Sequence, residues 1–107
     1  MRPNPAVVLT ETQSRIVAAI LAERIVRIGP VKVFGSRATG RARPGSDLDL
    51  VVFGPASERD LTDLWLAFEE SDLPIKVDVV VWDKITSQRF RDEIARHAIP
   101  FFEEAFA

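Results

Sequence analysis

The chain has 107 residues, of which 47% are hydrophobic and 28% charged, and its formal net charge is −2. This composition predicts one globular domain over residues 1–107 and argues against a general polyanion-binding protein, which would be strongly basic. The absence of cysteine excludes disulfides, thiol catalysis and zinc sites with cysteine ligands. The sequence has no segment typical of a signal peptide and none apolar enough to span a bilayer, so we expect a cytoplasmic protein without a membrane partner.

Capping residues and hydrophobic spacing predict alternating helices and strands. Thr10-x-x-Gln13 has the form of a capping box, and Ser57-x-x-Asp60 offers a second helix start. The predicted elements are a helix over 10–28, a strand over 31–34, a helical turn over 35–40, a loop over 41–46, a strand over 48–53, a helix over 57–73, a strand over 75–82 and a helix that begins at 83 or 86 and ends before 100. This order predicts the α/β (α+β) class, with a small mixed sheet of three strands and helices packed on it.

Two aspartates stand at the start of the predicted strand over 48–53. Asp47 and Asp49 are two residues apart, so in a strand both carboxylates project from one face, with Cα atoms about 6.6 Å apart. Like charges this close repel unless a cation stands between them, and Mg²⁺ with its oxygen ligands suits that position. The alternative is a solvated strand end at which Asp47 caps a turn.

A third aspartate lies in the middle of the most strand-like run of the chain. Asp78 shares one face of this strand with Val80 and Trp82. If the strand lies beside the one that carries Asp49, three carboxylates can hold two metal ions and promote an in-line displacement. The alternative is an isolated acid paired with a lysine or arginine.

The segment between the first two strands has the features of an anion-binding turn. Gly35 lets a phosphate approach the backbone closely, and Ser36 adds a hydroxyl group. Arg37, Arg41 and Arg43 follow and can offset the charge of a triphosphate. The alternative is an ordinary tight turn with solvated arginines.

Together these residues resemble the signature of the DNA polymerase β-like nucleotidyltransferase superfamily. The pattern G-S-x-x-x-G-x-x-x-x-x-S-D-x-D-L is filled at every fixed position from Gly35 to Leu50, and Asp78 falls where the superfamily carries a third acid. The short length resembles the minimal nucleotidyltransferase (MNT) branch. The resemblance covers residues 31–83 by motif and implies a nucleotidyltransferase fold.

The resemblance also implies a mechanism and its residues. Asp47, Asp49 and Asp78 would be the catalytic acids and the ligands of a two-metal Mg²⁺ site. The substrate would be ATP or another nucleoside triphosphate. The residues expected to bind it are Gly35, Ser36, Arg37, Arg43 and Ser46. An acceptor hydroxyl would attack the α-phosphorus, and pyrophosphate would leave.

The branch further implies a partner. MNT proteins are often paired with a small helical protein of the HEPN class, as the antitoxin of a toxin–antitoxin system, and some transfer AMP to a tyrosine of the toxin. We therefore expect transfer of AMP to a HEPN-type partner. Two alternatives stay open: an antitoxin that acts by contact alone, and a nucleotidyltransferase with a small-molecule acceptor. The apolar tail with Phe101, Phe102 and Phe106 can fold over the sheet or meet a partner or a second copy.

Overall fold

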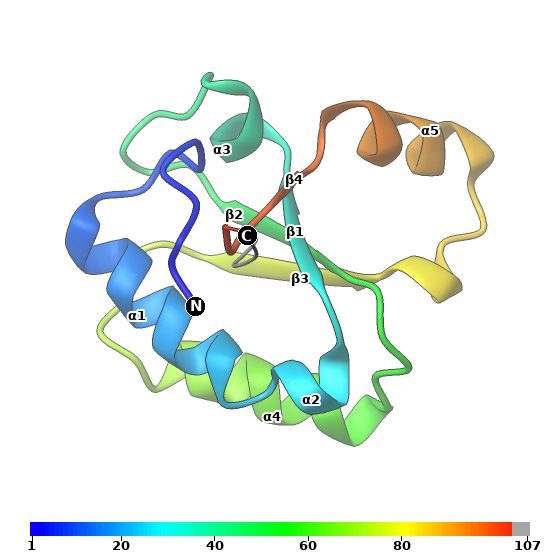
Figure 1. The fold of residues 1–107 in the computed structure, drawn as a ribbon, viewed down its shortest axis with the longest axis horizontal. Coiled ribbons are helices and arrows are strands. Elements are labelled where there is room, and N and C mark those ends of the chain that lie inside the picture. Colours follow the sequence, from blue (N-terminus) through cyan, green and yellow to red (C-terminus); the bar gives the residue numbers. More distant parts are fainter. Residues whose placement is uncertain (104–107) are drawn as a thin grey trace.

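The computed structural model describes residues 1–103, which form a four-stranded sheet with helices on both sides (Figure 1). The strands lie in the order β3-β2-β1-β4; β1 pairs antiparallel with β2 and β4, and β2 pairs parallel with β3. In chain order the elements are α1 (Glu11–Ala22), α2 (Ile25–Ile28), β1 (Val31–Phe34), α3 (Ser36–Thr39), β2 (Leu48–Val52), α4 (Glu58–Glu69), β3 (Val77–Val81), the 3₁₀ helix η1 (Trp82–Lys84), α5 (Gln88–His97) and β4 (Ile99–Pro100). The α/β class with a mixed sheet is therefore confirmed.

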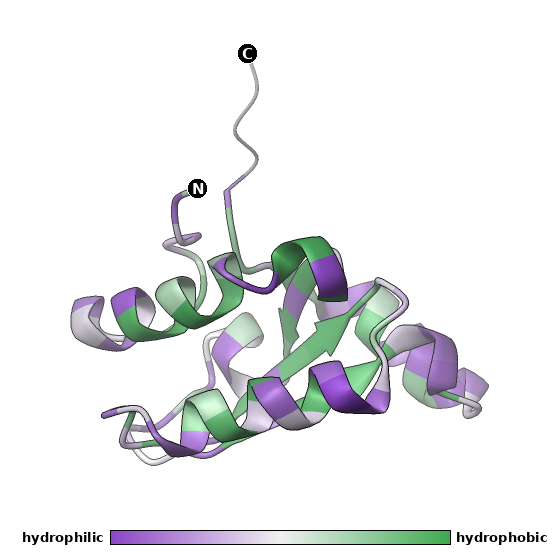
Figure 2. Ribbon diagram, turned by 90° about the horizontal axis from the view of Figure 1, so that it is seen from below, coloured by the Kyte–Doolittle hydropathy of each residue, from purple (hydrophilic) through white to green (hydrophobic). Residues whose placement is uncertain are grey.

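The main core lies between the sheet and the helices α1, α2 and α4, which share one side in Figure 1. The side chains of β2 point alternately to the two faces of the sheet. The even-numbered ones face this core and are fully buried: Leu48, Leu50 and Val52. The predicted capping box at Thr10 is present before α1, and the predicted cap at Ser57 before α4 is also a capping box. Figure 2 shows the strands as the most uniformly hydrophobic part of the fold.

Helix α5 lies on the opposite side of the sheet and covers only one end of it (Figure 1). Phe90 of α5 packs edge-on against Phe34 of β1, with ring centroids 5.6 Å apart. Arg91 donates a hydrogen bond to the carbonyl of Trp82 at 2.8 Å and lies over the Trp82 ring. Helix α5 is mostly hydrophilic in Figure 2, and few apolar residues attach it to the rest of the fold, among them Phe90 and the fully buried Ile94.

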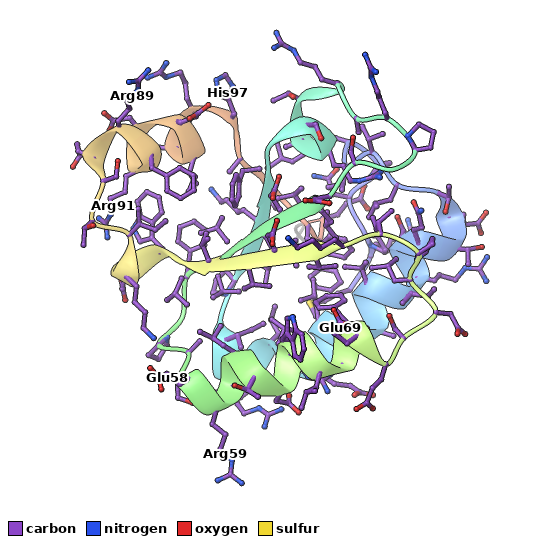
Figure 3. The ribbon with its side chains drawn as sticks, turned by 180° about the vertical axis from the view of Figure 1, so that it is seen from behind. Glu58, Arg59, Glu69, Arg89, Arg91 and His97 are labelled. Carbon is purple, nitrogen blue, oxygen red and sulfur yellow. The ribbon has the colours of Figure 1, made fainter. Side chains whose placement is uncertain are left out.

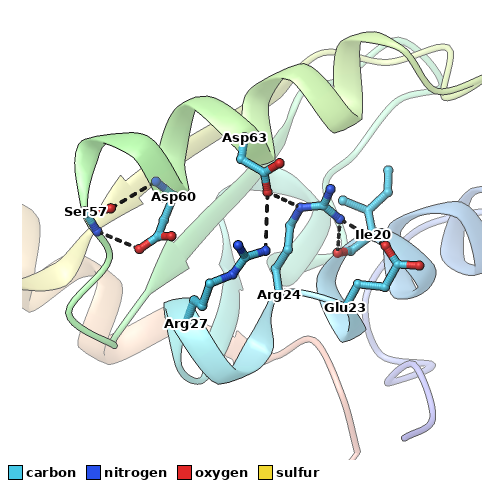
Figure 4. A network of polar contacts seen from close by, with 7 residues as sticks. All are labelled: Ile20, Glu23, Arg24, Arg27, Ser57, Asp60 and Asp63. Atoms are coloured by element: carbon cyan, nitrogen blue, oxygen red, sulfur yellow. Dashed lines mark hydrogen bonds and ion pairs between the residues drawn. The ribbon is translucent and has the colours of Figure 1, made fainter.

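The predicted helix over 10–28 is wrong in one respect, because it is broken between α1 and α2. Arg24 stands at the break, and its guanidinium donates to the Asp63 carboxylate of α4 at 2.7 Å and to the carbonyl of Ile20 at 2.9 Å (Figure 4). Arg27 of α2 also lies 3.6 Å from the same carboxylate. The short helix α2 is therefore turned toward α4 by a tertiary ion pair.

The expectation of three strands is also wrong, because β4 adds a fourth beside β1. The chain after β4 continues along the sheet: the N–H of Phe101 donates to the carbonyl of Val31, and the Phe101 side chain is fully buried. Phe106 lies outside the described residues. No helix within residues 1–103 has the length and apolar character needed to cross a membrane.

Candidate functional site

Strand register places Asp49 and Asp78 side by side on the face of the sheet opposite the main core. Phe34 of β1 pairs with Asp49 of β2, and Asp49 pairs with Asp78 of β3. Directly paired residues share a face, and neighbouring strands lie about 4.8 Å apart. The two carboxylates therefore project from adjacent positions into the space beside α3 and α5.

Gly35 directly follows β1 and lies next to the Asp49 side chain. It has φ 73° and ψ −157°, a conformation available in practice only to glycine. A Cβ atom built on Gly35 would collide with the Oδ2 atom of Asp49. The backbone of the Gly-Ser turn thus lies directly against the Asp49 carboxylate, and both the dihedral angles and the contact require glycine here.

Burial and the neighbouring carboxylates raise the proton affinity of Asp49. The pKa of Asp49 is raised above its ordinary value of 3.8, first because the side chain is partly buried and then because Asp78 and Asp47 are negatively charged; Lys76 opposes this effect. The ammonium of Lys76 lies 3.5 Å from the Oδ1 atom of Asp78. The site therefore holds more negative charge than this one exposed lysine offsets, which favours a bound cation.

The structure does not draw all three acids into one closed metal site. Asp47 is exposed and lies just before β2, which begins at Leu48. Within residues 1–103 no three acidic or histidine side chains stand close enough together to hold one metal ion. The paired carboxylates of Asp49 and Asp78 nevertheless suit Mg²⁺, which binds through one or two carboxylates and completes its shell with substrate phosphates and water. Metal ligation by these residues stays a prediction.

Arg37 has a different role from the expected one. Its side chain is buried, with only 3% exposed, and it donates hydrogen bonds to the carbonyls of Val8, Ser46 and Pro44 at 2.7–3.2 Å. A guanidinium committed to backbone carbonyls in this way cannot also meet a triphosphate. We therefore correct its assignment: Arg37 holds the loop that leads into Asp47.

The remaining predicted nucleotide-binding residues divide into two groups. Gly35 and Ser36 line a cleft of about 530 Å³ between α3 and α5. Ser46 instead accepts a hydrogen bond from the Arg43 N–H at 2.9 Å and helps to close the loop. Arg43 lines a separate hollow beside Val8 and Pro44, away from that cleft.

The cleft has a second wall that the sequence analysis did not assign. Arg41 joins the turn on one side, and α5 supplies Phe90, Glu93 and His97 on the other. Figure 3 shows His97 at the end of α5 on the side of the cleft. The sequence signal was available, because Phe90, Ile94 and His97 have helical spacing, but nothing in it placed this helix opposite the Gly-Ser turn.

Residues 15–100 match the sequence model of the nucleotidyltransferase domain. The chain belongs to the nucleotidyltransferase domain family. It is 41% identical, over 83 residues, to MntA of Haemophilus influenzae, which is described as a probable protein adenylyltransferase; the match spans 76% of this chain and 71% of that protein. The predicted resemblance is confirmed, and the protein is a nucleotidyltransferase enzyme.

Solved structures place this nucleotidyltransferase in the same fold. One chain provisionally classed as a minimal nucleotidyltransferase is 38% identical, with a TM-score of 0.63, over 83% of this chain and 91% of that one. A toxin–antitoxin structure with AMP-PNP gives a TM-score of 0.67 at 18% identity, over 86% of this chain and 74% of that one. A complex of a tri-AMPylated Shewanella oneidensis HEPN toxin with its MNT antitoxin gives 0.63 at 15% identity, over 90% and 74%. Because their identities are below 25%, the last two matches indicate the fold alone.

Proposed function

We propose that this nucleotidyltransferase transfers AMP from ATP to a hydroxyl group of a HEPN-type protein and thereby acts as its antitoxin. The observation that carries the proposal is the contact between the Gly-Ser turn and Asp49, with Asp78 in the adjacent position of the next strand. That arrangement brings a phosphate-binding turn and two carboxylates to one place. The 41% identical relative is described as a probable protein adenylyltransferase, which favours AMP and a protein acceptor.

The roles follow from the positions of the residues. Asp49 and Asp78, at paired strand positions, would hold Mg²⁺, and Asp47 would add negative charge at the edge of the site; the ion would supply neutralisation of the phosphate charge. Gly35 and Ser36 would bind the phosphates through the turn, and Arg41 at the rim of the same cleft would add a cation. The nucleoside would occupy the rest of the cleft against α5.

The reaction is a substitution at the α-phosphorus. The acceptor oxygen forms a bond to this phosphorus while the bond to the β-phosphate oxygen breaks, and pyrophosphate leaves with the electron pair. Asp78 orients the acceptor hydroxyl, whose proton passes to a carboxylate or to water. Positioning and charge neutralisation supply most of the rate acceleration. We place the reaction in the cytoplasm, because a chain without cysteine fits a reducing compartment.

Labelling tests the proposal directly. The protein is incubated with α-labelled ATP, Mg²⁺ and a HEPN-type protein, in parallel with Asp47→Ala/Asp49→Ala and with a control, Glu58→Ala, at an exposed acid outside the site. We expect label on the partner with the wild type and the control, and none with the double variant. Equal labelling by the double variant would refute the proposed site.

Neutralisation of the partner separates catalysis from contact. If transfer is the antitoxin activity, the double variant binds the HEPN-type protein but does not neutralise it. Full neutralisation by the double variant would favour action by contact alone, and label on small hydroxylated acceptors without the partner would favour a small-molecule acceptor.

A further inference from the structure

A groove runs between α4 and the outer strand β3 and reaches Asp78. It consists of two adjoining hollows of about 380 and 270 Å³, and five residues line both: Trp65, Phe68, Glu69, Lys76 and Val77. Asp78 lines the larger hollow. Figure 3 shows β3 crossing the front of the molecule, with Glu69 of α4 directly below it.

The floor of the groove is apolar and open to solvent. Trp65 is 55% exposed. Tryptophan is enriched among the residues that anchor protein interfaces. Val77 and Val79 point toward the main core and yet are only half-buried, because no part of residues 1–103 covers them from the outer edge of the sheet. Within residues 1–103 no strand pairs with that edge of β3, so its backbone N–H and C=O groups are available to another chain.

We propose that this groove binds the polypeptide segment of the partner that carries the acceptor hydroxyl, extended along β3. The inference rests on the proposed function and adds the path by which the acceptor reaches the site. In an in-line displacement the attacking and leaving oxygens lie on opposite sides of the phosphorus. Phosphates held at Gly35 and Ser36 put the leaving pyrophosphate on the β1 side of Asp49, so the acceptor enters from the β3 side, where the groove meets Asp78.

The walls of the groove define the chemistry of the segment. An extended peptide can add to the free edge of β3 through main-chain hydrogen bonds and place alternate side chains on the apolar floor. Glu69 lies in both hollows, and the exposed acids Glu70 and Asp72 follow it at the end of α4. The one lysine of the groove, Lys76, is already paired with Asp78 at 3.5 Å. The end of the groove away from Asp78 is therefore acidic, and it complements a segment with lysine or arginine a few residues from the acceptor residue.

Trp65→Ala tests the proposal, with Leu66→Ala as the matched control. Both side chains are exposed apolar residues of α4, at 55% and 43%, but Leu66 lines neither hollow. Binding of the HEPN-type protein is measured by calorimetry, and its labelling is measured from α-labelled ATP. For Trp65→Ala we expect partner affinity and kcat/KM for the partner to fall at least about tenfold, with the affinity for ATP unchanged. Leu66→Ala should match the wild type in all three.

A charge-reversal variant tests the acidic end independently. Glu69→Lys should weaken partner binding, and the loss should shrink as salt is added, because exposed charges are screened. Wild-type affinity and labelling for both Trp65→Ala and Glu69→Lys would overturn the proposal. So would a fall in self-association, measured by light scattering, with partner binding intact, since the groove would then hold a second copy of this chain.

The two hypotheses fail differently. If the wild type labels no protein but Trp65→Ala still weakens partner binding, transfer to this partner is wrong and the groove is a docking site alone. If the wild type labels the partner and Trp65→Ala labels it equally well, the proposed function stands and the groove assignment is wrong.

Discussion

Gly35 is the residue on which the geometry of the site depends most directly. A methyl group there meets the Asp49 carboxylate, whereas one on Gly40 meets nothing within 4 Å, although both glycines have positive φ, 73° and 78°. We predict that Gly40→Ala costs about 1–2 kcal/mol of stability and keeps transferase activity. Gly35→Ala should in addition lower kcat roughly 100-fold by displacing Asp49. Thermal denaturation and labelling of the same samples separate the two effects; similar activity in both variants would contradict the proposed contact.

The raised pKa of Asp49 predicts how stability depends on pH. Because the folded protein binds a proton at Asp49 more tightly than the unfolded chain does, this group contributes most stability below its ordinary pKa of 3.8, and the contribution is lost as pH rises through the raised pKa. In metal-free buffer at about pH 7, we therefore expect Asp49→Asn to melt at a higher temperature than the wild type, with a difference that disappears on acidification. The control Asp72→Asn changes the net charge equally at an exposed position and should show no such difference. A lower melting temperature for Asp49→Asn would refute the electrostatic account.

Arg37 shows why the type of a residue does not determine its role. The sequence places an arginine beside the turn predicted to bind phosphate, but the orientation of its side chain depends on the carbonyls of Val8 and Ser46, which only the folded chain brings near. We predict that Arg37→Lys costs about 2–4 kcal/mol of unfolding free energy, because lysine cannot make the forked hydrogen bonds. Arg43→Lys, at an exposed position, should change stability by less than about 0.5 kcal/mol. A large rise in KM for ATP without loss of stability in Arg37→Lys would restore the nucleotide-binding assignment.

At the scale of elements, local signals predicted the sequence order well and failed where tertiary contacts decide. The capping residues and the strand cores of β1, β2 and β3 are local features, so they were found. The break between α1 and α2 depends on Asp63, which is 39 residues from Arg24. Strand β4 has two residues, one of them Pro100, and is too short to show a pattern. Strand β4 forms because the free edge of β1 is available for pairing.

Helix α5 forms one wall of the cleft proposed for the nucleotide, and few apolar residues attach this helix to the fold, among them Phe90 and Ile94. Phe90 joins it to Phe34 through an aromatic contact worth about 0.5–1.5 kcal/mol beyond its buried area. We predict that Phe90→Ala raises KM for ATP more than it lowers kcat, since the acids stay on the sheet while the opposite wall moves. Arg89→Ala is the control, because Arg89 points away from the cleft in Figure 3. Steady-state kinetics of the two variants test this prediction. A loss confined to kcat would contradict it and would indicate that Phe90 acts on the reacting groups.

At the scale of the whole molecule, the site depends on strand order and register. The central position of β2 brings the end of β1 to one side of Asp49 and the start of β3 to the other. A slip of β3 by one residue would turn Asp78 toward the core. The sequence singled out the three acids as candidates, because the motif is local. It could not predict that β3 pairs parallel with β2 in this register.

The same arrangement predicts that metal and nucleotide stabilise the protein together. Two adjacent carboxylates, with Lys76 as their nearby cation, supply too few ligands for Mg²⁺ alone, so phosphates are needed to complete its shell. We expect ATP with Mg²⁺ to raise the melting temperature by about 10 °C at a ligand concentration of about 100 Kd, and ATP with EDTA to raise it far less. Asp49→Asn should lose the increase that depends on Mg²⁺, whereas Asp72→Asn should keep it. Because the measurement needs no acceptor, it tests the metal site independently of the partner, and an equal shift with EDTA would show that the carboxylates hold no metal with the nucleotide.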